Sequence, residues 1–232
     1  MKQRLLRTIA AAREREAELA GFCVDAEPTP GGRWSAKDHL AHLSWWRSRN
    51  ADLMDAVRTG VTLPPSVEDD AQNAIIHAEW RDRPADEIKA AARASWDRVE
   101  AAVAACSEED LQKPHPYADG FRLWQSVPGN GHGHVGQHLM FWSLDNGDEE
   151  RAEAAQVWVR DLDHEAFPDA ESMANADYNL ACLYARVGKI HEALPLLAAG
   201  FEGRPALVEL ARTDPDLDRI RDEPGLRRLL AS

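Results

Sequence analysis

The sequence predicts an all-α protein. In nearly every long segment, apolar residues recur every three or four positions, which is the period of an amphipathic helix. Alternating β-branched residues, which are typical of strands, are scarce. With 232 residues the chain can bury one large core or two smaller ones without disulfides. We therefore expect helices throughout, in one or two domains.

The first two helices are separated by a loop rich in proline and glycine. Residues 2–20 should form the first helix, and residues 27–34, EPTPGGRW, the loop that ends it. Ser35 resembles an N-cap, and Asp38 stands three residues later, as in a variant of the capping box. The second helix should start there and run towards Arg58.

Two further helical blocks complete the first half. Residues 63–66, LPPS, break the chain, and a helical stretch follows from about residue 67 to residue 105, with a joint at residues 83–84, Arg-Pro. A fourth helix should begin near Phe121, falter at residues 128–131 and resume through residue 144. Four helical blocks in about 147 residues are typical of a four-helix bundle.

The polar residues 146–150 mark a domain boundary, so we expect domains at residues 1–147 and 148–232. Part of the second domain resembles a tetratricopeptide repeat, a helix–turn–helix unit of 34 residues, with Gly200 where Ala is usual. The matching residues are Leu180, Ala181, Tyr184, Gly188, Ala193, Leu197 and Pro205. One repeat is fewer than a free-standing solenoid needs, so the segments near 150–164 and 205–231 should cap it or dock it on the bundle. The tail of the chain should form two short amphipathic helices.

Composition excludes several partners. Forty acidic and 27 basic residues give a net charge of −13, which disfavours nucleic acid and anionic membranes. No stretch approaches 18 uncharged apolar residues, and the N-terminal segment lacks the apolar core of a signal peptide. The three cysteines show no C-x-x-C spacing. We expect a cytoplasmic protein without a membrane anchor.

Histidine spacing suggests a metal site. His134 and His138 are four residues apart and can share one helical face. His42 is the best candidate for a third ligand, because it lies in an otherwise apolar stretch where an unpartnered imidazole would be costly. Taken alone, this spacing is a weak signal and more often indicates solvated or core histidines.

Two longer motifs contain these histidines. Residues 34–43, WSAKDHLAHL, are similar to the W-(S/T)-x-x-(D/E)-x-(L/V)-x-H-L signature of the DinB-like superfamily, and residues 129–138 resemble its G-N-T-x-x-H-x-x-x-H signature. The resemblance implies a four-helix bundle with His42, His134 and His138 around a divalent metal. Gly131 replaces the Thr of the signature, and Gln137 stands where Glu is common.

The resemblance also implies a chemistry. Residues 70–76 are similar to the third-helix segment of one branch of this superfamily, which contains the colibactin self-protection hydrolases. The maleylpyruvate isomerases belong to the same superfamily. Three neutral imidazoles suit zinc, which we favour, or nickel or iron, and leave a position open for water or substrate. Such an ion could activate water or a low-molecular-weight thiol cosubstrate against a small electrophile, in detoxification or self-resistance.

Other residues near the triad are weaker candidates. Asn73 could hydrogen-bond a substrate in a catalytic role or could face solvent. His39 could replace a metal ligand or support one, but we expect it to be exposed at the surface. His132 could be a loop histidine beside the site. Most of seven tryptophans should be core, with two or three lining a pocket. These are Trp34, Trp45, Trp46, Trp80, Trp96, Trp124 and Trp142.

Two function hypotheses follow. The first is a metal-dependent thiol transferase or hydrolase acting on a small electrophile. The second is a non-catalytic, metal-stabilised module that binds a protein partner through residues 148–232. A complete set of three histidines favours the enzyme.

Overall fold

The computed structural model describes residues 1–26, 33–62 and 68–231, and it confirms the predicted all-α class. No strand occurs in these described residues. The chain divides into two compact units, Met1–Asp145 and Asn146–Ser232, so the division falls two residues before the predicted boundary. Most of the predicted proline-rich loops, residues 27–32 and 63–66, lie outside the described residues.

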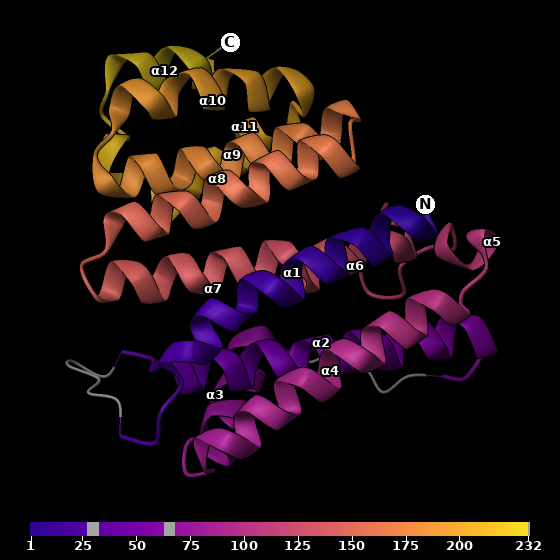
Figure 1. Cartoon of the computed structure of the whole chain (residues 1–232). Coiled ribbons are helices and arrows are strands. Elements are labelled where there is room, and N and C mark those ends of the chain that lie inside the picture. The colour runs from indigo at the N-terminus through magenta and orange to yellow at the C-terminus, as the bar shows by residue number, and fades with distance from the viewer. Residues whose placement is uncertain (27–32, 63–67, 232) are drawn as a thin grey trace. The chain divides into compact units, whose positions relative to one another are not determined.

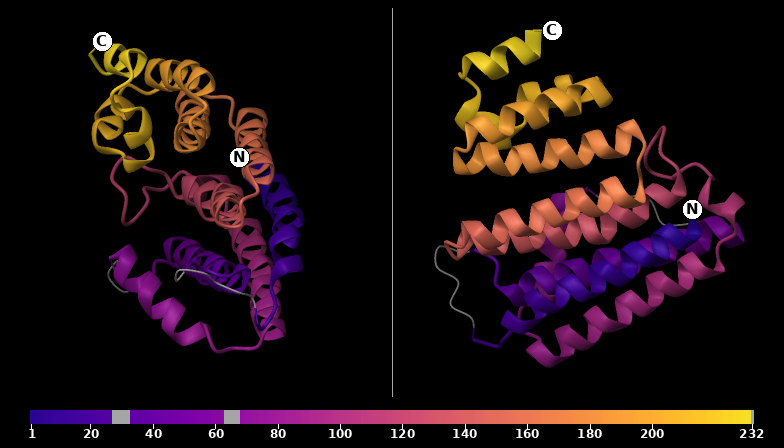
Figure 2. Two further views of the ribbon diagram at one scale, coloured as in Figure 1. Left: turned by 90° about the vertical axis from the view of Figure 1, so that its left-hand side faces the viewer. Right: turned by 45° about the horizontal axis from the view of Figure 1, so that its top comes forward.

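The first unit contains four long helices packed on one another (Figures 1 and 2). α1 contacts each of the other three, and α2 also packs on α4 and α7. The four helices are α1 (Lys2–Phe22), α2 (Ala36–Thr59), α4 (Ala85–Ala105) and α7 (His132–Asp145). Shorter elements connect them: α3 (Asp69–Trp80), α5 (Glu108–Leu111), η2 (Leu123–Gln125) and α6 (Ser126–Asn130).

The capping box predicted for α2 is confirmed. The Ser35 hydroxyl accepts a hydrogen bond from the Asp38 backbone N–H at 3.1 Å, and the Asp38 carboxylate accepts one from the Ser35 N–H at 2.9 Å. Gly60, in the left-handed conformation with φ of 79°, ends the helix. The cap fixes where α2 begins and therefore which of its residues face inward.

The third predicted block is two helices, α3 and α4, separated at the predicted joint. The chain leaves helical structure at the predicted joint, where Pro84 is the N-cap of α4. α4 joins the bundle core, whereas α3 packs on α2 and buries only Ile76. The sequence marked the joint by its proline, but it could not show that only α4 joins the core, because both segments have helical periodicity.

A glycine interrupts the fourth predicted helix. A Cβ on Gly131 would lie 2.7 Å from the carbonyl oxygen of Val127, closer than a side chain can approach. The Thr of the family signature would therefore clash in this backbone. Gly131 allows α6 to end and α7 to begin at His132, where an interruption was predicted.

A buried ion pair joins three bundle helices. The guanidinium of Arg47 on α2 pairs with the carboxylate of Glu16 on α1, and both side chains are almost fully buried. From α4, the Trp96 indole N–H donates to Glu16 at 2.8 Å, and the Ser95 hydroxyl accepts from Arg47 at 3.0 Å. Burial raises the pKa of Glu16 and lowers that of Arg47, and each charge opposes the shift of the other.

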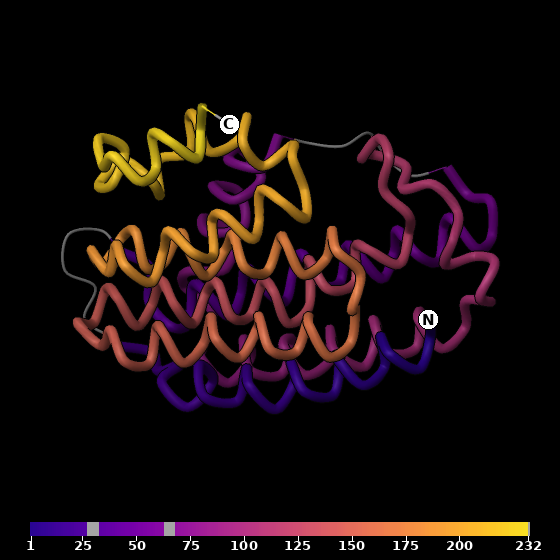
Figure 3. The backbone as a smooth tube through the Cα atoms, turned by 90° about the horizontal axis from the view of Figure 1, so that it is seen from above, coloured from indigo at the N-terminus to yellow at the C-terminus, as the bar shows by residue number. Residues whose placement is uncertain are grey.

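The second unit is built around a helical hairpin. α9 (Ala170–Val187) packs on both α8 (Glu149–Ala166) and α10 (Ile190–Gly203), and Figure 3 shows the three running alongside one another. Gly188, with φ of 81°, ends α9. The tail forms three elements, not the two predicted helices: α11 (Ala206–Thr213), η3 (Pro215–Ile220) and α12 (Pro224–Ala231). Among the described residues, no helix combines the length and apolarity that a bilayer span requires.

Removing one member of the ion pair should destabilise the first unit strongly. Glu16→Leu leaves the buried Arg47 charge uncompensated, so we expect the free energy of unfolding in urea to fall by about 3–5 kcal/mol. The double variant Glu16→Leu/Arg47→Leu should recover most of this loss. The control is Asp52→Ala, which removes an exposed ion pair with Arg98 and should cost at most about 1 kcal/mol. Equal effects of Glu16→Leu and Asp52→Ala would contradict this account.

Candidate metal centre

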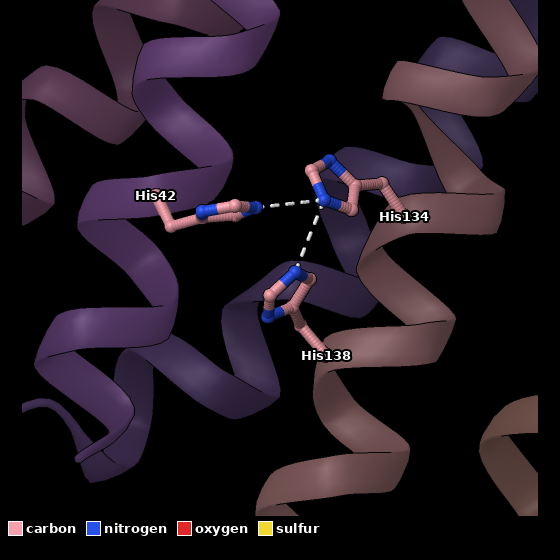
Figure 4. Close-up of side chains that lie close together, drawn as sticks. All are labelled: His42, His134 and His138. Atoms are coloured by element: carbon pink, nitrogen blue, oxygen red, sulfur yellow. Dashed lines mark hydrogen bonds between the residues drawn. The ribbon is translucent and has the colours of Figure 1, made fainter. Parts of the chain in front are cut away.

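Three histidine side chains from two helices converge in the first unit. The Nε2 atom of His134 lies 3.0 Å from Nε2 of His42 on α2 and 3.0 Å from Nε2 of His138, one turn further along α7. Figure 4 shows the three rings turned towards one another. One nitrogen from each ring lies within 4.8 Å of the other two. The structure thus brings together the three residues that the sequence singled out.

The spacing fits one shared cation. Nitrogens bound to the same ion at roughly 2.1 Å lie about 3.0–3.4 Å apart, which is close to the observed separation. His134 Nε2 can offer one proton or one lone pair, yet it faces two imidazole nitrogens. A cation between the rings would use all three lone pairs. The triad could therefore hold a metal, whose identity stays a prediction.

The electrostatics keep the triad in its ligating form. Burial lowers the pKa of His42 to about 4. Burial is also the main cause that holds the pKa values of His134 and His138 well below the ordinary value, and the other histidines add to it. The charge of Arg47 contributes to the shift at His134. All three imidazoles are therefore neutral near pH 7, as metal ligation requires.

His39 is buried, which corrects the expectation that it is exposed. The residue lies one turn before His42 on α2 and is 4% exposed. Its Nδ1 lies 2.7 Å from Nδ1 of His138. The sequence carried a signal for this position, because residue 39 is three residues before His42 and shares its inward face.

A cavity of about 990 Å³ opens beside the triad. Its lining includes the three triad histidines, His39 and the aromatic rings of Trp34, Trp46 and Phe141. Charged residues also line it: Arg33, Arg49, Asp52, Asp69 and Asp145. Arg33 pairs with Asp145 and Asp52 with Arg98. A small molecule in this cavity would contact the aromatic rings of its lining as well as the histidine triad.

The structure places the other candidate residues as follows. Asn73 lines the cavity from α3, and its side-chain oxygen accepts a hydrogen bond from the Trp46 indole N–H at 2.9 Å. Gln137 also lines the cavity, as an amide where the family often has a carboxylate. His132 is a buried residue at the start of α7, not a loop histidine, and it is absent from the lining formed by the described residues.

Most tryptophans are not fully buried, contrary to expectation. Of the seven in the first unit, only Trp96 and Trp142 are buried. Trp34 and Trp46 line the cavity, as predicted for two or three of them. The face of Trp34 lies nearly parallel to that of His138, with ring centroids 6.0 Å apart. Apolar character alone could not distinguish a core tryptophan from one at a cavity wall.

His115 also lines the cavity, and sequence reasoning missed it. It lies in the connection between α5 and η2, where its Nδ1 accepts a hydrogen bond from the Tyr117 backbone N–H at 3.2 Å. Burial lowers its pKa, so the ring is neutral and Nε2 carries the proton. No sequence motif surrounds residue 115 that could have marked it.

Acid should weaken the metal-free protein through the buried histidines. Since the folded-state pKa of His42 is depressed from 6.5 to about 4, the unfolded chain binds the proton first, and stability is lost as pH falls through this window. His42→Gln should therefore lose less unfolding free energy than the wild type between pH 7 and pH 5, measured by urea titration of tryptophan fluorescence. His191→Gln, at an exposed position on α10, is the control and should follow the wild type. Parallel curves for wild type and His42→Gln would refute this prediction.

Comparison with known proteins identifies the family. A search for similar curated proteins and solved structures finds no match. The family model described as the DinB superfamily matches residues 5–141, which reach from the first turn of α1 to the last turns of α7 and include all three triad histidines. Because this match covers more than half of the 232 residues, the chain belongs to the DinB superfamily.

Proposed function

We propose that this protein is a metal-dependent transferase or hydrolase that acts on a small electrophilic substrate. The observation that carries the proposal is the convergence of three neutral imidazoles at the wall of a large cavity. A structural metal site has four protein ligands and no access, whereas this triad has three and borders open space. Zinc is the favoured ion, with nickel and iron as alternatives.

The chain's own residues would position both reactants. When bound, a divalent ion would supply Lewis acidity and lower the pKa of a water or thiol beside it. His42, His134 and His138 would hold that ion, and Trp34 and Trp46 would exclude water on one side. Asn73 holds the Trp46 indole by its side-chain oxygen, which leaves the amide N–H groups to contact a substrate.

A thiol nucleophile would have to come from solution. The three cysteines, Cys23, Cys106 and Cys182, are all buried. Burial raises the pKa of Cys106 and of Cys182, which keeps these thiols protonated. A low-molecular-weight thiol cosubstrate is therefore one candidate nucleophile, and water is the other.

The branch within the superfamily is part of the proposal. Residues 70–76, which resemble the self-protection branch, lie on α3, and Asn73 in this segment lines the cavity. Differences in substrate specificity between branches would arise from the residues of α3 that line the cavity. A role in detoxification or self-resistance is what the resemblance implies.

For the second unit we propose a single tetratricopeptide-like hairpin with capping helices. α9 and α10 form the hairpin, and a Cβ on Gly203 would lie 2.9 Å from the carbonyl oxygen of Ala170. Small residues at such points are what this repeat needs where its helices approach. The alternative function, a non-catalytic module that binds a protein through this unit, has only a cavity of about 270 Å³ near Asn175 and Arg204 in its favour.

Metal content tests the first step of this proposal. His134→Ala and His138→Ala should each abolish stoichiometric metal uptake, because two imidazoles remain, and both should keep the helical circular dichroism of the wild type. His77→Ala is the matched control: the Nε2 of this histidine lies 3.5 Å from the Asp38 carboxylate, outside the triad, so the variant should leave metal content unchanged. Elemental analysis of the purified proteins gives the answer. Wild-type metal content in both triad variants would refute the site.

Turnover tests the second step. The zinc-loaded protein should consume reactive electrophiles such as epoxides or maleyl compounds, and His138→Ala should lower the rate by at least 100-fold. Running the screen with and without low-molecular-weight thiols separates the two nucleophiles, since only a transferase depends on the thiol. Equal rates for wild type and His138→Ala would overturn the assignment as an enzyme.

A further inference from the structure

The ring of His138 is held from two sides. Its Nε2 faces the triad, 3.0 Å from His134, and its Nδ1 faces His39, 2.7 Å from Nδ1 of that residue. Trp34 lies nearly parallel to the same ring. The imidazole of His138 therefore contacts the triad through one nitrogen and α2 through the other.

Proton counting fixes the roles of these nitrogens. A neutral imidazole has one N–H and one lone pair. If the Nε2 lone pair of His138 faces an ion, its proton is on Nδ1, and His39 Nδ1 must accept that proton in a hydrogen bond. His39 then carries its own proton on Nε2. This arrangement is the one in which a second residue sets the tautomer of a metal-binding histidine.

His39 is not placed to be a ligand beside His138. The two nitrogens of an imidazole point in different directions, and His39 lies against the Nδ1 of His138, away from the three converging Nε2 atoms. His39 is also absent from the group of histidines that could share an ion within the described residues. Its contact with the site runs through His138.

Packing alone does not explain a histidine at this position. The side chain is buried, and its Nε2 has no hydrogen-bond partner among the described residues. A buried polar atom without a partner costs free energy that a leucine would avoid. The 2.7 Å contact with His138 is the interaction that a leucine could not replace.

We propose that His39 is a positioning residue for the metal site, which accepts a hydrogen bond from Nδ1 of His138 and thereby directs Nε2 of His138 to the ion. This inference rests on the proposed function, because it requires that the triad bind a metal. It adds to the three ligands a fourth histidine that acts only through His138. Loss of such a partner typically weakens metal binding by 10–100-fold.

Two substitutions at one position separate positioning from packing. His39→Leu removes the acceptor and keeps an apolar side chain, so zinc affinity should fall about 10–100-fold while the metal-free protein melts at or above the wild-type temperature. His39→Asn offers a side-chain oxygen at a similar distance from the backbone and should stay within a few-fold of wild type. Dissociation constants for Zn²⁺ and Co²⁺ are measured on the full chain by competition with a chromophoric chelator. His77→Leu is the control, because His77 lies near Trp34 without contacting a triad nitrogen, and it should bind as the wild type does.

The outcomes distinguish this inference from the proposed function. Weak binding by His39→Leu with recovery in His39→Asn supports it. Wild-type zinc affinity in His39→Leu overturns the inference while leaving the metal site intact. Equally weak zinc binding by His39→Leu and His39→Asn, both folded, also overturns the inference. If His39→Leu does not fold, the ¹⁵N NMR tautomer of His39 in the zinc-loaded wild type decides, since a proton on Nδ1 of His39 would refute the inference and leave ligation by His138 intact. Absence of metal binding by the wild type refutes the proposed function itself.

Discussion

The ion pair between Glu16 and Arg47 is the interaction on which the first unit depends. It lies where α1, α2 and α4 meet, and Trp96 and Ser95 of α4 satisfy part of its hydrogen-bonding capacity. A buried charge pair tolerates little displacement, because either charge alone would be strongly destabilising. The same guanidinium lowers the pKa of His134. One pair thus joins three helices of the bundle, and its guanidinium helps to keep His134 neutral.

Stability alone does not explain why ring nitrogens of His39, His42 and His134 are buried together. His39 Nε2, His42 Nδ1 and His134 Nδ1 are buried without hydrogen-bond partners among the described residues. Apolar side chains would fill this space at lower cost. Features that oppose stability while converging on a cavity are typical of functional sites, where local rules of packing are broken for chemistry.

The two units differ in what they contain. The first has the candidate metal site, and the second has an apolar core of its own. The first holds the triad, its cavity and all residues matched by the family model. The second buries a separate apolar cluster that includes Tyr178, Leu197 and Leu217 from three elements. A core of this kind explains why the second unit is compact.

Local sequence determined much of this protein. Helical periodicity predicted the helices, the capping box at Ser35 fixed the start of α2, and the spacing of His134 and His138 placed two imidazoles on one face, because each of these depends on neighbours a few residues apart. Tertiary structure decided the rest. It alone showed that α3 stands outside the bundle core, that His39 is buried against His138 and that His115 lines the cavity. These features arise from contacts between segments distant in the chain, and a single sequence does not record which distant residues meet.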